Sequence, residues 1–300
     1  MCTNIPKRIY YCWFGGNKPQ NVLDCIKTWK DKLPDYEIVE INENTPNIFD
    51  IEQAKQDNLW FKTCYENNIW GVAIDYVRLK VLYDNGGIYF DTDVTVEKDI
   101  TELVEKNKLI VGWEDSNTIG CGGIVIAKKH DKNIKRMLNF LDKEIWESSK
   151  CTGPHCFTYI LSKYYKLKPS TEITENDDII VFPTEYFYPI PFINPGKEKE
   201  KYITNKTYCV HWWSATWVKP NIGYFMKYKH KIKLDKLLNL CFEKKSIINN
   251  PFLKIEKLFK SYSINIDFYY LFKFKYRYYG DKRFLTIFIF GIQIPIWRVG

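Results

Sequence analysis

Residues 71–94 constrain the fold of this 300-residue chain more than any other part of the sequence. Apolar residues recur at every fourth position from Ala73 to Val81, and a Gly-Gly pair follows. This spacing predicts a helix over residues 71–85 that ends at the glycines, because glycine tolerates the backbone of a helix C-terminus. The next residues predict a strand over residues 88–96. A helix that leads directly into an apolar strand is typical of an α/β sheet.

Two aspartates, Asp91 and Asp93, lie toward the end of this predicted strand. Side chains alternate along a strand, so Tyr89, Asp91 and Asp93 are expected on one side. Neighbouring carboxylates repel each other unless a cation lies between them, and Mg²⁺ or Mn²⁺ prefers oxygen ligands. Such an ion takes its remaining ligands from water and substrate phosphates. The pair therefore indicates a phosphate-bearing ligand, although an isolated Asp-x-Asp is also common in solvated turns.

The preceding helix carries an acid and a base that share one face. Asp75 and Arg78 are three residues apart, which brings their side chains together on a helix. Alone, the pair would be read as a surface ion pair of under about 1 kcal/mol. Next to the two acids of the strand, it is better read as part of the same site.

The rest of the chain fits a covered sheet. A strand at 7–14, a helix at 19–32 and a strand at 36–41 predict a strand–helix–strand unit and a largely parallel sheet. The further expected elements are strands at 109–113, 123–127, 179–182 and 208–212, helices at 132–146, 157–165, 227–244 and 252–262, an irregular connection at 183–195, and a terminal hairpin at 283–290 and 293–299.

Charge divides the chain near residue 219. Residues 219–300 hold 17 Lys and Arg against five Asp and Glu, a net charge of +12, and 19 of the 51 aromatic residues. Residues 1–218 carry a net charge of −4. We therefore expect a body of residues 1–218 and a basic, aromatic appendage of helices and a hairpin. That appendage is either a solvated basic face or a surface for an anionic membrane. No nucleic-acid fold signature accompanies the charge, so nucleic acid is not expected as a partner.

Several features favour a cytoplasmic protein. The longest apolar stretch, residues 284–297, falls short of the roughly 20 residues that span a bilayer. The first eight residues lack the apolar region of a signal peptide. The nine cysteines are scattered and form no CxxC, which favours reduced thiols. No zinc site is expected at Cys151, His155, Cys156 and His211, because their spacing matches no standard zinc motif.

Residues 71–94 resemble the sugar-binding region with the Asp-x-Asp motif of family-32 glycosyltransferases. That group includes bacterial capsule and lipopolysaccharide enzymes and yeast-type initiating mannosyltransferases, and it is distantly similar to the clostridial glucosylating toxins. The matching blocks are Ala73-Ile74-Asp75-Tyr76-Val77-Arg78-Leu79, Gly86-Gly87-Ile88-Tyr89 and Asp91-Thr92-Asp93-Val94. Residues 5–16 resemble the family's first strand, and Gly153-Pro154 and residues 211–217 resemble its later motifs. The likeness covers residues 4–217.

The resemblance implies a GT-A fold, which is a Rossmann-like mixed sheet flanked by helices, for a catalytic domain of residues 1–218. It also implies a nucleotide-diphosphate sugar donor, with a UDP-sugar preferred, a divalent Mn²⁺ or Mg²⁺ ion, and retention of anomeric configuration. The implied catalytic residues are Asp75 and Arg78 on the donor sugar, Asp91 on ribose, sugar or a metal-bound water, and Asp93 on the metal. Tyr89 is grouped with the donor-binding residues.

Further residues complete the implied donor site. Trp13 would stack on the nucleobase. Residues 211–217 would close over the diphosphate, with His211 or Ser214 near the metal or phosphate and Trp217 on the β-phosphate. The leaving phosphate would help to deprotonate the acceptor.

The resulting hypothesis is a metal-dependent retaining glycosyltransferase. It would move a hexose or N-acetylhexosamine to a glycan or lipid-linked oligosaccharide in capsule, lipopolysaccharide or other surface polysaccharide synthesis. The enzyme would work in the cytoplasm or at the inner face of the membrane. Two alternatives stay open: a glycosyltransferase that acts on a protein, and a sugar-nucleotide-binding module without turnover.

Overall fold

The computed structural model describes residues 5–150, 152–192, 199–214 and 220–242, together with the backbone of four strands between residues 263 and 296. The chain divides into two compact units, Met1–Leu234 and Asp235–Gly300. This division falls later than the boundary at residue 219 that the charge distribution predicts, and helix α9 (Pro220–Tyr228) belongs to the first unit.

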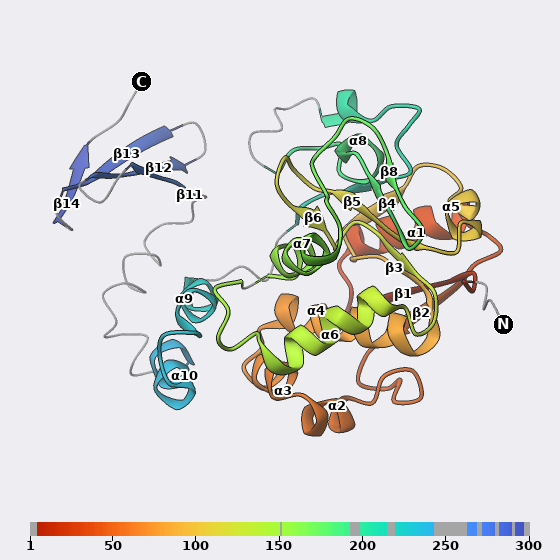
Figure 1. Ribbon diagram of the computed structural model, residues 1–300, viewed down its shortest axis with the longest axis horizontal. Helices are drawn as coiled ribbons and strands as arrows, with labels where there is room; N and C mark the ends of the chain where they lie inside the picture. Colours follow the sequence, from red (N-terminus) through yellow and green to blue (C-terminus); the bar gives the residue numbers. More distant parts are fainter. Residues whose placement is uncertain are drawn as a thin grey trace. The chain divides into compact units, whose positions relative to one another are not determined.

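A mixed sheet forms the centre of the first unit (Figure 1). In sheet order its strands are β2 (Glu37–Ile41), β1 (Arg8–Cys12), β3 (Gly87–Tyr89), β7 (Val125–Ala127), β5 (Leu109–Trp113), β9 (Ile179–Phe182) and β8 (Thr174–Glu175), with β6 (Ile119–Gly120) paired to β5. Strand β1 runs parallel to β2 and β3, and β5 runs parallel to β9. Strands β7 and β8 run antiparallel to their neighbours, so the expectation of a largely parallel sheet is wrong for these two.

Helices cover both faces of the sheet, as an α/β fold requires to bury its strands. Helix α1 (Gln20–Lys32) buries Val22, Ile26 and Trp29 against Ile9 of β1 and Ile88 of β3. Helix α4 (Trp70–Asn85) packs against β1, β3 and β7 from the other face, with α3 (Leu59–Glu66) and α6 (Lys132–Lys143) beside it (Figure 1). The remaining helices of the first unit are α2 (Ile51–Asp57), α5 (Thr101–Glu105), α7 (Gly153–Tyr164), α8 (Thr184–Phe187) and the short 3₁₀ helix Lys199–Tyr202.

The predicted stop of helix α4 at two glycines is confirmed. Gly86 and Gly87 have φ angles of 70° and 120°, which side chains rarely allow. A Cβ atom on Gly86 would lie 2.6 Å from the amide nitrogen of Lys129, and one on Gly87 would lie 2.7 Å from the carbonyl oxygen of Arg8. The glycines therefore permit the sharp change from helix to buried strand.

The predicted strand at 88–96 is not continuous. It divides into β3 and β4 (Val94–Val96), and the residues between them form a turn in which the amide of Val94 donates to the carbonyl oxygen of Asp91, at 3.2 Å. Strand β4 leaves the main sheet and pairs antiparallel with β10 (Cys209–His211), which places Val94 opposite His211. Asp91 and Asp93 therefore meet through a turn and not through strand alternation.

In the second half of the chain, the apolar periodicity of the sequence predicts the helices less accurately. The helix expected at 227–244 is two helices, α9 and α10 (Leu234–Phe242), and the expected connection at 183–195 contains α8. The helix expected at 252–262 lies outside the described residues. Among the residues described, no helix has both the length and the apolar character needed to cross a membrane.

The C-terminal unit holds an antiparallel four-stranded sheet. Its strands follow chain order and are β11 (Ser263–Phe268), β12 (Phe272–Tyr279), β13 (Lys282–Ile289) and β14 (Ile292–Ile296). The predicted terminal hairpin is confirmed, because β13 and β14 pair antiparallel from Ile289 opposite Ile292. Strands β11 and β12 have no counterpart in the sequence prediction.

Trp29 is expected to contribute strongly to stability, because its side chain links helix α1 to strand β4. Its side chain is fully buried, and its Nε1 donates to the carbonyl oxygen of Val94 at 2.7 Å. Trp29→Phe should lower the free energy of unfolding by about 1–3 kcal/mol, through the lost hydrogen bond and the lost packing. Leu23→Ala on the exposed side of the same helix should change it by under about 1 kcal/mol. Urea unfolding measures both, and equal losses would contradict this role.

Candidate active site

One edge of the central sheet collects residues from distant parts of the chain. Strands β5 and β3 both run antiparallel to β7, so they point the same way as β1. The carboxyl ends of these strands therefore share one edge, where α/β sheets hold ligands. Trp13 follows β1, Asp91 follows β3 by two residues and Glu114 follows β5. Residues 121–123 enter β7 from the same edge.

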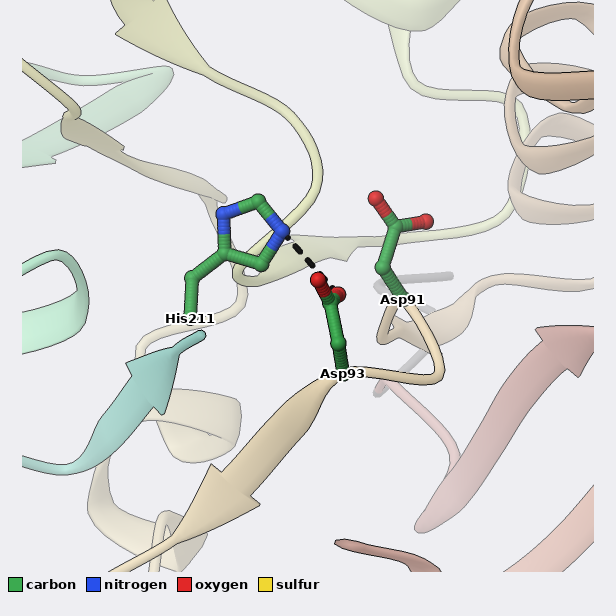
Figure 2. Close-up of side chains that lie close together, drawn as sticks. All are labelled: Asp91, Asp93 and His211. Atoms are coloured by element: carbon green, nitrogen blue, oxygen red, sulfur yellow. Dashed lines mark ion pairs between the residues drawn. The ribbon is translucent and has the colours of Figure 1, made fainter. Parts of the chain in front are cut away.

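Three side chains near this edge could hold a metal ion. Asp91, Asp93 and His211 each offer one ligand atom, and these atoms lie within 4.8 Å of one another. Figure 2 shows the three side chains pointing toward a common space, with the ion pair between Asp93 and His211 drawn as a dashed line. The pairing of β4 with β10 produces this arrangement, because it aligns the start of β4 with the end of β10.

Asp93 is fixed by backbone and imidazole groups. The amide of Ser214 donates to its Oδ2 at 2.7 Å, and Nε2 of His211 lies 3.1 Å from its Oδ1. Burial alone would raise the pKa of Asp93, but the His211 ring and the Ser214 amide outweigh it and lower the pKa. Burial likewise opposes the protonation of His211, but the carboxylate of Asp93 raises the pKa of the imidazole. The Asp93 carboxylate thus favours the protonated form of His211.

A buried arginine joins the predicted helix and strand. Nη2 of Arg78 lies 3.0 Å from Oδ1 of Asp91 and 3.5 Å from Oδ1 of Asp75, and Nη1 donates to the carbonyl oxygen of Cys121. Its guanidinium group also lies over the ring of Tyr89, 4.8 Å from the ring centroid. The Arg78 side chain is 4% exposed and that of Asp75 is 12% exposed, so a surface ion pair is ruled out. Tyr89 is itself buried, and it acts on the site by packing under Arg78.

Asp75 connects the site to helix α7. The amide of Gly153, the first residue of α7, donates to Asp75 Oδ2 at 2.8 Å. Burial raises the pKa of Asp75 to about 6, although Arg78 and the Gly153 amide act in the opposite direction. A Cβ atom on Gly153 would lie 2.4 Å from Asp75 Oδ1, so the close approach of α7 requires glycine here. Burial similarly raises the pKa of Asp91, against the effect of Arg78.

Trp13 lies at the same edge and is half-buried. Its amide donates to the carbonyl oxygen of Ile41 at 3.0 Å, and its Nε1 donates to that of Gly16 at 3.2 Å. A Cβ atom on Gly15 or Gly16 would meet nothing within 4 Å. The space at Gly15 and Gly16 is therefore open, and the stacking role of Trp13 stays a prediction.

The structure describes only part of the predicted motif at residues 211–217. His211 points into the metal-ligand group, while Ser214 contributes its amide to Asp93. Trp217 lies outside the described residues. Trp213 adopts a positive φ of 57°, and its ring centroid lies 4.2 Å from that of His211.

Two residues at the site escaped the sequence prediction. The hydroxyl of Tyr188 accepts a hydrogen bond from the amide of Gly123 at 2.9 Å, and it thereby supports the segment behind the metal ligands. Glu114 carries a carboxyl group whose pKa burial raises to about 8. Like Asp91, Glu114 comes after an apolar strand, but strand direction decides whether that position reaches the site.

Parts of this chain are similar to known glycosyltransferases. A family model described as "glycosyltransferase sugar-binding region containing DXD motif" matches residues 19–110, and one described as "alpha 1,4-glycosyltransferase conserved region" matches residues 130–229. A lactosylceramide 4-alpha-galactosyltransferase of Pongo pygmaeus is 26% identical over 160 residues, which are 50% of this chain and 70% of that protein. An inositol phosphoceramide mannosyltransferase 3 of Schizosaccharomyces pombe is 32% identical over 101 residues, 33% of this chain and 27% of that protein.

Among solved structures, the glycosyltransferase PaToxG matches with a TM-score of 0.43 at 20% identity, over 54% of this chain and 70% of that one. The match to the human lactosylceramide 4-alpha-galactosyltransferase spans 43% of that relative's length.

The fold and site define an α/β protein with an acid-rich ligand site at the carboxyl ends of its strands. Residues 19–110 and 130–229 thus match models of glycosyltransferase regions, the first of them containing the Asp-x-Asp motif, and these relatives are glycosyltransferases. The predicted resemblance is confirmed, and so is the predicted α/β architecture with a mixed, helix-covered sheet.

Gly122→Ala is expected to weaken metal binding without unfolding the chain. A Cβ atom on Gly122 would lie 2.4 Å from Asp91 Oδ2 and 3.3 Å from His211 Nε2, so the carboxyl group has to turn away. Affinity for Mn²⁺ should fall by about 10- to 100-fold. Gly223→Ala in α9, where a Cβ atom meets nothing within 4 Å, is the matched control and should keep it. Calorimetric titration measures the Mn²⁺ affinity of both variants, and unchanged affinity in the Gly122 variant would contradict this geometry.

Asp75→Asn is expected to change how stability depends on pH. The pKa of Asp75 is about 6 in the folded chain against an ordinary 3.8, so protonation favours folding. The stabilisation by protonated Asp75 is complete below the ordinary pKa of 3.8 and is lost as pH rises through the folded-state pKa of about 6. The variant has no such group, so its free energy of unfolding relative to that of wild type should rise by about 3 kcal/mol from acid to neutral pH. Urea unfolding over that range measures the gain, and a pH-independent difference would contradict it.

Proposed function

We propose that the chain transfers a sugar from a nucleotide-diphosphate sugar to a hydroxyl group of a glycan, with a divalent cation on the diphosphate. One observation carries the proposal: Asp91, Asp93 and His211 converge at the strand edge that also holds the buried Asp75–Arg78 pair. The first group suits a cation and a diphosphate, while the second suits the hydroxyl groups of a sugar. A nucleotide-diphosphate sugar has these two parts side by side.

The ligand atoms fit a divalent cation of the Mn²⁺ or Mg²⁺ kind. Two carboxylates supply hard oxygen donors, and His211 adds a nitrogen donor that favours Mn²⁺ over Mg²⁺. Gly122 supports the fit, because any side chain there would push against Asp91. When bound, the cation would neutralise the charge that develops on the departing diphosphate.

The chain's own residues would hold the donor in place. Asp75 and Arg78 are fixed by the Gly153 amide and the Cys121 carbonyl, so they present hydrogen-bonding groups to the sugar without further ordering. Because Arg78 also contacts Asp91, the sugar end and the metal end of the site are rigidly connected. Trp13 would stack on the nucleobase beside the open space at Gly15.

Retention of configuration follows if the acceptor attacks from the side of the leaving group. The acceptor oxygen then bonds to the anomeric carbon while the bond from that carbon to the phosphate oxygen breaks. The electron pair stays on the phosphate oxygen, which takes the acceptor's proton. The description "alpha 1,4-glycosyltransferase" of the second family match supports an α-linked product, which an α-linked UDP-sugar gives with retention.

The relatives support a lipid-linked acceptor. The lactosylceramide and inositol phosphoceramide enzymes carry names of sugars or alcohols joined to lipids. A glycan or lipid-linked oligosaccharide of a capsule or lipopolysaccharide is our finer proposal, with a UDP-hexose or UDP-N-acetylhexosamine as donor. The net charge of +12 in residues 219–300 supports contact with an anionic membrane, and this contact stays a prediction. A protein acceptor remains the alternative.

Asp93→Ala is expected to abolish turnover. A panel of UDP- and GDP-sugars with Mn²⁺ should identify a donor that the wild type binds and slowly hydrolyses. The variant should lose at least about 100-fold in hydrolysis, as should wild type with excess chelator. Asp177→Ala at an exposed position is the control and should keep the wild-type rate.

The same assay separates the competing functions. Binding of a sugar nucleotide without hydrolysis or transfer in the wild type would favour a non-catalytic binding module. Full activity of Asp93→Ala with metal present would show that the catalytic reading is wrong.

A further inference from the structure

We propose that Glu114 binds the hydroxyl group that accepts the sugar. This inference rests on the proposed function, since it assigns one more substrate contact at the same site. Neither the sequence motif nor the metal-ligand group includes this residue.

The backbone fixes Glu114 at the ligand-binding edge of the sheet. It comes directly after β5, and its amide donates to the carbonyl oxygen of Thr118 at 2.8 Å, which closes the hairpin between β5 and β6. The hairpin continues into Cys121 and Gly122, whose carbonyl oxygens accept hydrogen bonds from Arg78 and from the Asp91 amide. Glu114 is therefore anchored on the same rigid segment that forms the back of the site.

The carboxyl group of Glu114 has charged neighbours from both halves of the site. His211, Asp75 and Arg78 act on it electrostatically, as does its neighbour Asp115. His211 belongs to the proposed diphosphate end, while Asp75 and Arg78 belong to the proposed sugar end. The bond that breaks joins these two ends. A carboxyl group near both ends is within reach of a hydroxyl group that arrives beside that bond.

The Glu114 carboxyl group is also unengaged within the described part of the chain. No hydrogen bond or ion pair is formed by its side chain there, although the residue is half-buried. The other acids of the site are all engaged: Asp75 by Gly153, Asp91 by Arg78 and Asp93 by Ser214. The carboxyl group of Glu114 is therefore available to a ligand. A hydroxyl group can both donate to a carboxyl group and accept from it.

Hydrolysis of the donor tests the assignment, because water then takes the place of the accepting hydroxyl group. The probes are UDP-galactose, UDP-glucose and UDP-N-acetylglucosamine with Mn²⁺, and nitrophenyl β-lactoside as an added acceptor. Glu114→Ala should lower kcat for hydrolysis about 10- to 100-fold and leave the donor KM and the Kd for UDP within about twofold. Glu114→Gln should lose less, because an amide still binds a hydroxyl group, and its matching shape preserves the fold. If the lactoside is accepted, its KM should rise in both variants.

Asp115→Asn is the matched control. It removes a carboxylate from the next residue, is exposed, and keeps the oxygen that accepts from the Asn117 amide. Wild-type kcat is expected for this variant. Unchanged kcat in both Glu114 variants would overturn the inference and leave the proposed function standing. A raised donor KM with unchanged kcat would assign Glu114 to the donor sugar and also overturn it. A wild type that neither binds nor hydrolyses any sugar nucleotide would instead refute the proposed function.

Discussion

The site depends on one buried guanidinium group. Arg78 is almost completely removed from water, and a buried charge is tolerated only when opposite charges and hydrogen-bond acceptors surround it. Asp75, Asp91 and the carbonyl oxygen of Cys121 meet this requirement from one helix, one strand end and one loop. These three parts of the chain can therefore not move apart without exposing an unpaired charge to an apolar interior. The arginine thus orders this edge of the sheet.

This arrangement also explains how neighbouring acids coexist. Asp91 and Asp93 are two residues apart, yet they have different partners: Arg78 stabilises the first and His211 the second. Burial raises the pKa of Asp91, whereas the imidazole and the Ser214 amide keep that of Asp93 low. The same backbone turn thus carries one acid paired with the buried Arg78 and one acid paired with His211.

Much of the fold could be predicted from local pattern. The stripe from Ala73 to Val81 and the glycines after it identify α4 and its end, because helix periodicity and glycine backbone freedom are local properties. The turn between β3 and β4 was missed, since the apolar pattern is the same on both sides of it and only pairing with β10 separates the strands. Strands β11 and β12 were missed, although aromatic and basic residues alternate along β12 and Gly280-Asp281 follows it, which together are a local hairpin signal.

For the site, the sequence by itself determined the acids and the base: Asp75 and Arg78 by helix spacing, Asp91 and Asp93 by adjacency. Their chemistry does not depend on the rest of the chain, and it sufficed to indicate a cation and a phosphate. The likeness of residues 211–217 to a known motif already pointed to His211 and Ser214. Tertiary structure decided how they act: His211 joins the acids, Ser214 serves through its amide, and Glu114 follows β5 at the same edge of the sheet. These placements depend on strand direction and long-range pairing, which arise from packing the whole chain.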